Sequence, residues 1–427
     1  MSRSTICRMV ARKIIDGMGR GTIELEIETE SGQAVAAPSL AHPRTQGQFE
    51  IVHYPKGGVD EAIRIIREQI MPKLIGREAA DQAAVDRMLK EIDGTPNFAK
   101  IGGNTAEVVS TCVAKAAAAS FGIPLHLYLG SPLSVKLPNL LINIIGGGPT
   151  SGGEFWRGRT PDIQEHNIIP VGAKSITESI MTGIRVHERV GQLSGEADPH
   201  YTGGRDFEYS WVPSVDDRKA LDILHQACVE VEKETGVKIR MGVDVAGEDL
   251  WIPNEKVYFC KKENVKRTRS QYFDFIANLI ESYDLYYIED PFRDDDFELH
   301  HELTKQFGNK CLIVGDDLFA TNPERLKKGI DLGAANAAIV KVNMIGTLTD
   351  TYEFIQLAKK NNIVTIISPR TGDTCDTTLS HLGVGWGVEL LKTGGAIGGE
   401  RIAKVNELIR IEEALGDRCS MVRLGCT

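Results

Sequence analysis

The stretch Asp284-Leu-Tyr-Tyr-Ile-Glu-Asp-Pro-Phe292 joins a short apolar and aromatic run to two carboxylates, Glu289 and Asp290, and Pro291 then ends the run. A buried parallel strand reads as a continuous hydrophobic run, and ligands gather where such strands end. The two carboxylates are therefore a candidate cation site. Taken alone, however, such a segment is more often a strand end capped by solvated acids.

The rest of the chain repeats this pattern several times. Short apolar runs carry, in chain order, Asp244, Glu289, Asp316 with Asp317, Lys341, Arg370 and Lys392. After a longer first step, successive charged residues are separated by about the length of one βα unit. Such a unit takes roughly 25 to 35 residues. The longer first step leaves room for an extra segment at residues 251–266. The pattern predicts a C-terminal (β/α)8-type barrel with these residues near strand ends on one common face.

The N-terminal third has a different organisation. Residues 22–29 alternate strictly between apolar and polar, which is typical of an antiparallel strand with one solvated face, and residues 34–38 are expected to return beside it. Helical spacing follows at 59–75, 81–92 and 105–121. A meander followed by helices predicts an α+β domain, so we expect an α+β capping domain over residues 1–133 and the β/α barrel over residues 134–427.

Composition limits the partners and the compartment. The 427 residues carry a net charge of −10 and are 42% hydrophobic, which argues against nucleic acid as the main partner. No stretch reads as a secretory signal or a transmembrane span. The eight cysteines contain no CxxC pair and are expected to be reduced thiols. We therefore expect a cytoplasmic protein that acts on a small molecule, without membrane or nucleic-acid partners.

Three of the charged residues suit a metal ion. Asp244, Glu289 and Asp316 offer hard oxygen ligands from three strand ends, without cysteine or histidine. Such a set favours Mg²⁺, which keeps water or substrate in its other positions. The sequence therefore predicts Mg²⁺ as the cofactor.

Lys341 is the candidate general base. A lysine beside a divalent cation and another lysine has its ammonium form disfavoured, so we expect its pKa to fall toward the range of a working base. Lys392 could hold a substrate carboxylate, and Glu165 or Glu208 could protonate a leaving hydroxyl. The predicted reaction is proton abstraction α to a carboxylate followed by β-elimination. The alternatives are a core ion network for Lys341 and solvated loop acids for Glu165 and Glu208.

Several motifs of the chain resemble the enolase (phosphopyruvate hydratase) family, of which the chain looks like a divergent member. They are Asp244-Val-Ala, Ile288-Glu-Asp-Pro-Phe292, Gly315-Asp-Asp-Leu318, Lys341-Val-Asn343 and the closing run from Lys392 to Glu413. The resemblance implies Asp244, Glu289 and Asp316 as magnesium ligands, Lys341 as base, and Glu165 and Glu208 as the acid side. It also implies that Lys392 grips the substrate carboxylate and Arg370 the phosphate.

The loops over the phosphate end depart from the family pattern. The family's Ser-His-Arg-Ser-Gly run is here Ser368-Pro-Arg-Thr-Gly372, and the histidine of its glycine loop is replaced by Thr150. The mobile loop with its serine is rebuilt as Ser39-Leu-Ala-His-Pro-Arg44. We therefore expect the substrate to be contacted by Ser39, Thr150, Arg157, Arg159 and Thr371 in addition to Lys392 and Arg370. Arginines in these loops would suit a second or bulkier anionic group.

Three functions therefore stay open, of which two are enzyme activities and one is a non-catalytic role. The first is a Mg²⁺-dependent lyase of the phosphopyruvate hydratase type, a housekeeping enzyme of glycolysis acting on 2-phosphoglycerate and phosphoenolpyruvate. The second is a specialised paralogue, such as a carboxyphosphonoenolpyruvate synthase of phosphonate or phosphinate biosynthesis. The third is a non-catalytic binding protein with the same fold. In each case we expect a homodimer or higher homo-oligomer and a phosphorylated or phosphonate carboxylic acid as the small-molecule partner.

Overall fold

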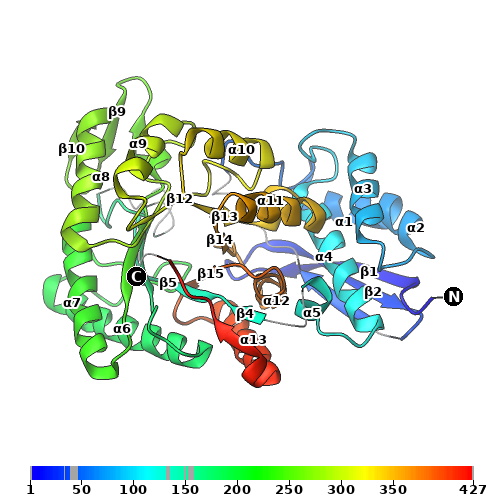
Figure 1. Ribbon diagram of the computed structural model, residues 1–427. Helices are drawn as coiled ribbons and strands as arrows, with labels where there is room; N and C mark the ends of the chain where they lie inside the picture. Colours follow the sequence, from blue (N-terminus) through cyan, green and yellow to red (C-terminus); the bar gives the residue numbers. More distant parts are fainter. Residues whose placement is uncertain are drawn as a thin grey trace.

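The computed structural model describes residues 2–32, 34–38, 47–130, 135–148, 151 and 158–425. The N-terminal part, blue to cyan in Figure 1, lies beside a closed barrel formed by the rest of the chain. Both predicted architectures are confirmed: an antiparallel meander with helices comes first, and an eight-stranded barrel follows.

The N-terminal sheet is a three-stranded antiparallel meander. Its strands are β1 (Ile6–Ile15), β2 (Gly21–Thr29) and β3 (Ala34–Pro38), in the order β1-β2-β3. The predicted hairpin is confirmed, and β1 is an additional strand that the alternation of residues 22–29 did not reveal. Ile23, Leu25 and Ile27 of β2 are fully buried, because a period of two places them on the one face that packs against the helices.

The helices of this part lie close to their predicted positions. They are α1 (Gly58–Ile65), a π-helical turn (Ile66–Ile70), α2 (Met71–Leu74), α3 (Gln82–Asp93), α4 (Gly103–Ser120) and α5 (Leu125–Leu129). The side chain of Asp81 caps α3 by accepting a hydrogen bond from the backbone N–H of Ala84. Nearly all of α4 is buried, as its small apolar residues predict, so it forms the centre of this part.

The barrel strands close in the order β11-β12-β13-β14-β15-β5-β6-β7. Their bounds are β5 (Asn139–Gly146), β6 (Glu165–Ile169), β7 (Arg240–Asp244), β11 (Tyr287–Glu289), β12 (Leu312–Gly315), β13 (Ala337–Val340), β14 (Val364–Ile367) and β15 (Leu390–Gly395). The expected βα alternation fails at its start, because no helix is described between β5 and β6. Without a crossover helix, β6 pairs antiparallel with both β5 and β7.

Helices cover the outside of the barrel. They are α6 (Ile176–Ala197), α7 (Asp217–Thr235), α8 (Arg269–Tyr283), α9 (Phe297–Phe307), α10 (Pro323–Leu332), α11 (Leu348–Lys360), α12 (Thr378–Gly385) and α13 (Gly399–Leu415). Short 3-10 turns cover Gly247–Leu250, Val342–Met344 and Gly416–Arg418. The extra segment predicted at residues 251–266 folds as a small sheet of β8 (Trp251–Ile252), β9 (Val257–Cys260) and β10 (Val265–Thr268), and β4 (Val135–Leu137) pairs with β16 (Cys419–Met421).

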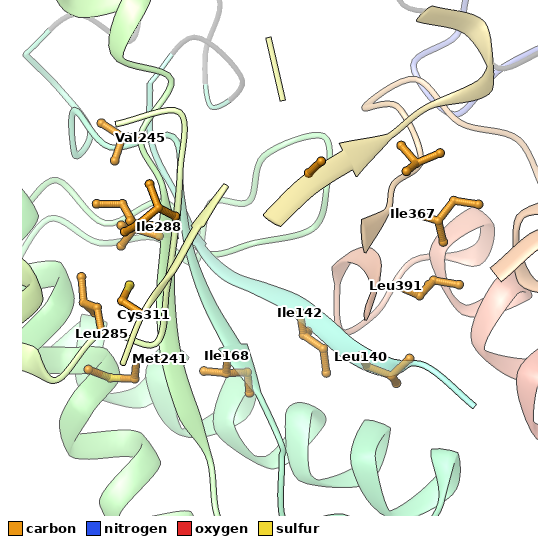
Figure 2. Close-up of a cluster of buried hydrophobic side chains, with 14 of the residues drawn as sticks. Leu140, Ile142, Ile168, Met241, Val245, Leu285, Ile288, Cys311, Ile367 and Leu391 are labelled. Carbon is orange, nitrogen blue, oxygen red and sulfur yellow. The ribbon is translucent and has the colours of Figure 1, made fainter. Parts of the chain in front are cut away.

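Alternate residues of the barrel strands enter two different cores. Leu140 and Ile142 of β5, Ile168 of β6, Ile288 of β11 and Leu391 of β15 belong to the large core between strands and helices (Figure 2). The intervening residues, among them Leu141, Ile169, Tyr287, Ile339, Ile366 and Leu390, form a separate core inside the barrel. Every second residue of a strand therefore points toward the barrel axis.

This alternation decides where the charged residues lie. Glu289 is two residues beyond Tyr287, Lys392 is two beyond Leu390, and Lys341 is two beyond Ile339. Each therefore continues the inward-facing row of its strand at the end where the loops begin. In the part of the chain that the structure describes, no helix combines the length and apolar character needed to cross a membrane.

Candidate active site

A cavity of about 380 Å³ lies where the barrel strands end. Eight of the predicted site residues line it: Glu165, Glu208, Asp244, Asp316, Lys341, Arg370, Thr371 and Lys392. Glu289 does not line the cavity but is fully buried and bonded to Lys392, which does. The predicted charged residues are therefore brought together from strands spread over more than 200 residues of sequence.

Strand register aligns three of the carboxylates. Glu165 of β6 lies opposite Asp244 of β7, and Asp244 lies opposite Glu289 of β11. Because β6 runs antiparallel, its first residue rather than its last reaches the end where the cavity lies. The three carboxylates thus form one row across neighbouring strands.

Lys392 holds this row together. Its ammonium lies 2.8 Å from Glu289 Oε2, 2.9 Å from Asp244 Oδ2 and 3.0 Å from Glu165 Oε2. Burial by itself would lower the pKa of Lys392, but the charges of Asp244, Glu165 and Glu289 outweigh burial and raise that pKa well above its ordinary value. Lys392 is therefore charged and faces the acids, and the grip on the substrate carboxylate that the resemblance implies stays a prediction.

Glu289 is held from below by the phenol of Tyr287, which donates a hydrogen bond to Glu289 Oε2. Burial, with the charge of Asp244 added to it, raises the pKa of Glu289 well above its ordinary value. Gly242 of β7 leaves room for Tyr287, since a Cβ at residue 242 would lie 2.5 Å from the Tyr287 Cβ.

The donor set fits a divalent cation. Asp244 and Glu289 already bind one cationic group, the ammonium of Lys392, through oxygens that face the same point. Glu289 Oε1 and Asp316 Oδ1 are buried and accept no hydrogen bond from a described residue. Buried carboxylates left in this state are stabilised by a cation, and an all-oxygen set of this kind suits Mg²⁺.

Among the described residues, the acidic group with closely clustered ligand atoms is not the predicted set, because it shares only Asp316 with that set. Ligand atoms of Asp290, Asp316 and Asp317 lie within 4.8 Å of one another. Both oxygens of Asp290 are already engaged, since they accept the backbone N–H groups of Asp316 at 3.0 Å and Asp317 at 2.7 Å. Asp290 has a positive φ of 38°, a conformation that costs energy outside glycine, and these two bonds hold it there. Asp290 thus shapes the turn that carries Asp316.

Lys341 lies across the cavity from the row of Glu165, Asp244 and Glu289. Its ammonium contacts Asp316 Oδ2. Burial would lower the pKa of Lys341, but Asp316 and Asp317 outweigh it and raise that pKa above its ordinary value. This direction is opposite to the expected one, because the expectation included a bound cation that would neutralise Asp316. The ion pair places the Lys341 ammonium at the cavity and against one of the predicted metal ligands.

Glu165 and Glu208 are both buried, so the alternative of solvated loop acids is wrong. Burial, together with the charges of Glu208 and Asp244, raises the pKa of Glu165 to about 7 despite Lys392. Glu208 accepts hydrogen bonds from Thr371 Oγ1 at 3.3 Å and from Asn143 Nδ2 at 3.4 Å. Of the two, Glu165 has the raised pKa, and a carboxyl group that keeps a proton near neutral pH is suited to act as a general acid.

The remaining predicted substrate contacts differ in where they lie. Thr371 lines the cavity beside Arg370, whereas Arg159 is exposed and is not among its described lining residues. Ser39, Thr150 and Arg157 lie outside the described residues, so their predicted contacts stay predictions. Pro369, at the position of the family's histidine, does line the cavity.

Glu50 is a residue at this site that the sequence patterns do not reveal. Its carboxylate binds Arg370 in a buried ion pair, and its own segment, Gln48-Phe-Glu-Ile-Val-His53, places one acid and one histidine in a mainly apolar stretch. Ionisable residues in such a stretch signal a buried polar pair, but the barrel partner cannot be identified from the spacing.

Comparison with known proteins agrees with this geometry. Residues 6–129 match the family model "Enolase, N-terminal domain", and residues 134–423 match "Enolase, C-terminal TIM barrel domain". The chain is 47% identical over 405 residues to a protein named enolase from Methanosphaera stadtmanae, covering 95% of this chain and 96% of that one. It is 45% identical to an enolase from Methanothermobacter thermautotrophicus (95% of each chain) and 41% identical to one from Pyrobaculum aerophilum (97% of each chain). The chain belongs to the enolase family.

Proposed function

We propose that this chain is a Mg²⁺-dependent carbon–oxygen lyase that interconverts 2-phosphoglycerate and phosphoenolpyruvate. One observation carries the proposal: Lys341 and Glu165 face the same cavity from β13 and β6, which are four strands apart in either direction around the barrel. A substrate between them would meet a base on one side and an acid on the other. Removal of an α-proton and loss of a β-hydroxyl from opposite faces need that arrangement.

Asp244, Glu289 and Asp316 would hold the magnesium ion. When bound, Mg²⁺ would draw charge from the substrate carboxylate and so make the neighbouring proton more acidic. It would also offset the charge of Asp316, which now stabilises the ammonium form of Lys341. The chain's own residues bring the other parts of the chemistry to the same cavity.

Lys341, as the neutral amine, would take the α-proton. Glu208 would give a proton to the departing hydroxyl, and Glu165, whose pKa is raised to about 7 mainly by burial, would assist as the second carboxyl on that side. Thr371 and Asn143 orient the Glu208 carboxylate by donating to one oxygen each. Arg370 would bind the phosphate, since a guanidinium matches an oxyanion in two parallel hydrogen bonds.

We also propose a division of labour between residues 1–133 and residues 134–427. The barrel would carry the catalytic residues, and the N-terminal part would close one side of the cavity with Gly47 and Gln48, which line it.

No described residue offers a contact that would favour the alternative of a substrate with a second or bulkier anionic group. Arg370 is the one arginine that lines the described cavity. A non-catalytic role would leave the joint presence of base, acid and ligands without a purpose. We therefore propose the ordinary substrate pair.

The deciding experiment follows phosphoenolpyruvate absorbance from 2-phosphoglycerate with Mg²⁺ and with a chelator. We expect turnover that depends on Mg²⁺, with kcat/KM in the enzymatic range of about 10⁵ M⁻¹s⁻¹ or above. No turnover of 2-phosphoglycerate at saturating Mg²⁺ by a folded sample would contradict the proposal.

A further inference from the structure

A buried ion pair joins the N-terminal part of the chain to the cavity. Glu50 Oε2 lies 2.9 Å from Arg370 Nη1, and Glu50 Oε1 lies 3.1 Å from Arg370 Nη2. The two side chains are 0% and 2% exposed, although they are 320 residues apart in sequence. The contact is bidentate, so it fixes both the position and the plane of the guanidinium.

Glu50 is itself held by two further contacts. Glu50 Oε1 accepts the backbone N–H of Gly47 at 2.7 Å, and Glu50 Oε2 lies 2.6 Å from His53 Nε2. Burial would raise the pKa of Glu50, but the charge of Arg370 and the hydrogen bonds of His53 and Arg370 outweigh burial and hold that pKa far below its ordinary value. The carboxylate is therefore ionised in the folded protein, with its orientation set from three directions.

The segment that carries Glu50 is pressed against the barrel. A Cβ at Gly47 would lie 2.4 Å from Asp317 Oδ1, so any other residue here would displace the Asp317 carboxylate. Beyond Gln48, which lines the cavity, the Phe49 ring lies 3.4 Å from the guanidinium carbon of Arg325. Arg325 in turn donates to the backbone carbonyls of Leu318 and Asp294. Segment 47–50 is thus a fixed part of the cavity wall.

Glu50 does not line the described cavity, whereas Arg370 does. A flexible arginine would lose side-chain entropy when it bound an anion, and a guanidinium already held in place loses less. The holding group must be anionic and buried, since a neutral partner would leave a buried guanidinium without its counter-charge.

We propose that Glu50 is a positioning residue for Arg370, which it holds in the orientation that binds the phosphate of the substrate. The proposal deepens the proposed function and rests on it for the identity of the anion. Through Gly47, Glu50 also links this orientation to the seating of segment 47–50 on the barrel. Glu50 acts through Arg370 and does not touch the substrate.

The test compares Glu50→Gln with the wild type. Glutamine keeps the shape and one acceptor oxygen but removes the charge, so we expect KM for 2-phosphoglycerate to rise about tenfold or more with a smaller change in kcat. Protection against thermal unfolding by inorganic phosphate, which needs no turnover, should weaken in parallel. Glu61→Gln is the matched control, because Glu61 pairs with the exposed Arg64 in the same part of the chain.

Two further variants separate positioning from a structural role. Glu50→Asp keeps the counter-charge of Arg370 but shortens the side chain, and we expect the same rise in KM from it, even if Glu50→Gln does not fold. Adding Glu50→Gln to Arg370→Met should raise KM no further than Arg370→Met does alone, since a residue that acts through Arg370 has nothing left to position.

A lowered melting temperature with unchanged KM and unchanged phosphate protection in Glu50→Asp would overturn the proposal. So would additive effects of the Glu50 and Arg370 substitutions on KM. If the wild type does not turn over 2-phosphoglycerate but phosphate still protects it in a Glu50-dependent way, the proposed function fails while the positioning role stands.

Discussion

The ammonium of Lys392 lies 2.8 Å from Glu289 Oε2, although strands β15 and β11 stand on opposite sides of the barrel. The contact crosses the barrel axis one layer above the apolar residues Leu390 and Tyr287. At this level the interior is therefore filled by an ionic cluster. Asp244 and Glu165 complete that cluster, so removing one acid leaves Lys392 with two counter-charges.

This redundancy predicts the behaviour of Glu289→Gln. We expect the variant to fold, because Lys392 keeps its contacts with Asp244 and Glu165. Its affinity for Mg²⁺ should fall about tenfold or more, since one of three charged ligands becomes neutral, and turnover should be lost. Titration calorimetry with Mg²⁺ and circular dichroism measure the two properties separately. Failure to fold would instead favour the structural ion network, and Glu298→Gln, which changes an exposed acid, is the control.

Base and acid can be separated by isotope exchange. Lys341→Ala should abolish exchange of the substrate α-proton with solvent deuterium, since it removes the amine proposed to take that proton. Glu208→Gln should retain exchange while elimination falls by about a hundredfold or more. Nuclear magnetic resonance of 2-phosphoglycerate in D₂O measures exchange, and absorbance measures elimination. Equal loss of exchange in both variants would mean that these roles are misassigned.

The sequence predicted the barrel and most of its charged residues because both depend on local patterns. Apolar runs that end in Asp244, Glu289, Asp316 and Lys341 identify strands and strand ends without any knowledge of their partners. The direction of β6 was not predicted, since it depends on whether a helix lies between β5 and β6. Glu50 was missed for the same kind of reason, because its role follows from a contact with Arg370 across 320 residues.

A pair of buried acids away from the cavity, Asp162 and Asp217, predicts how the stability of the protein depends on pH. Burial, with the charge of Asp162 added to it, raises the pKa of Asp217 to about 7, and Asp217 accepts the backbone N–H of Ile163 at 2.9 Å. Between the unfolded pKa near 3.8 and the folded pKa near 7, the folded state holds a proton that the unfolded chain has released. This carboxyl group therefore makes stability fall as pH rises through that window, and its effect levels off above pH 7.

Asp217→Asn should remove this part of the slope. Asparagine cannot ionise but can still accept the Ile163 N–H, so we expect the variant to gain on the order of 2 kcal/mol relative to the wild type between pH 5 and pH 8. Urea unfolding at several pH values measures the difference. Parallel curves for the two proteins would contradict the prediction, and Asp222→Asn, on the exposed face of the same helix, is the control.

Substitutions at two arginines in different surroundings test how large the anionic end of the substrate is. Arg370 is buried, bound to Glu50 and lines the cavity, whereas Arg159 is exposed and is not among the described lining residues. We therefore expect Arg370→Lys to lower kcat/KM for 2-phosphoglycerate by about tenfold or more, because lysine cannot form the bidentate contact with Glu50 and phosphate. Arg159→Ala should leave kcat/KM within about twofold of the wild type. If the wild type turns over 2-phosphoglycerate poorly and Arg159→Ala improves or further impairs it markedly, the rebuilt loops select a larger anion, and the ordinary substrate pair is the wrong assignment.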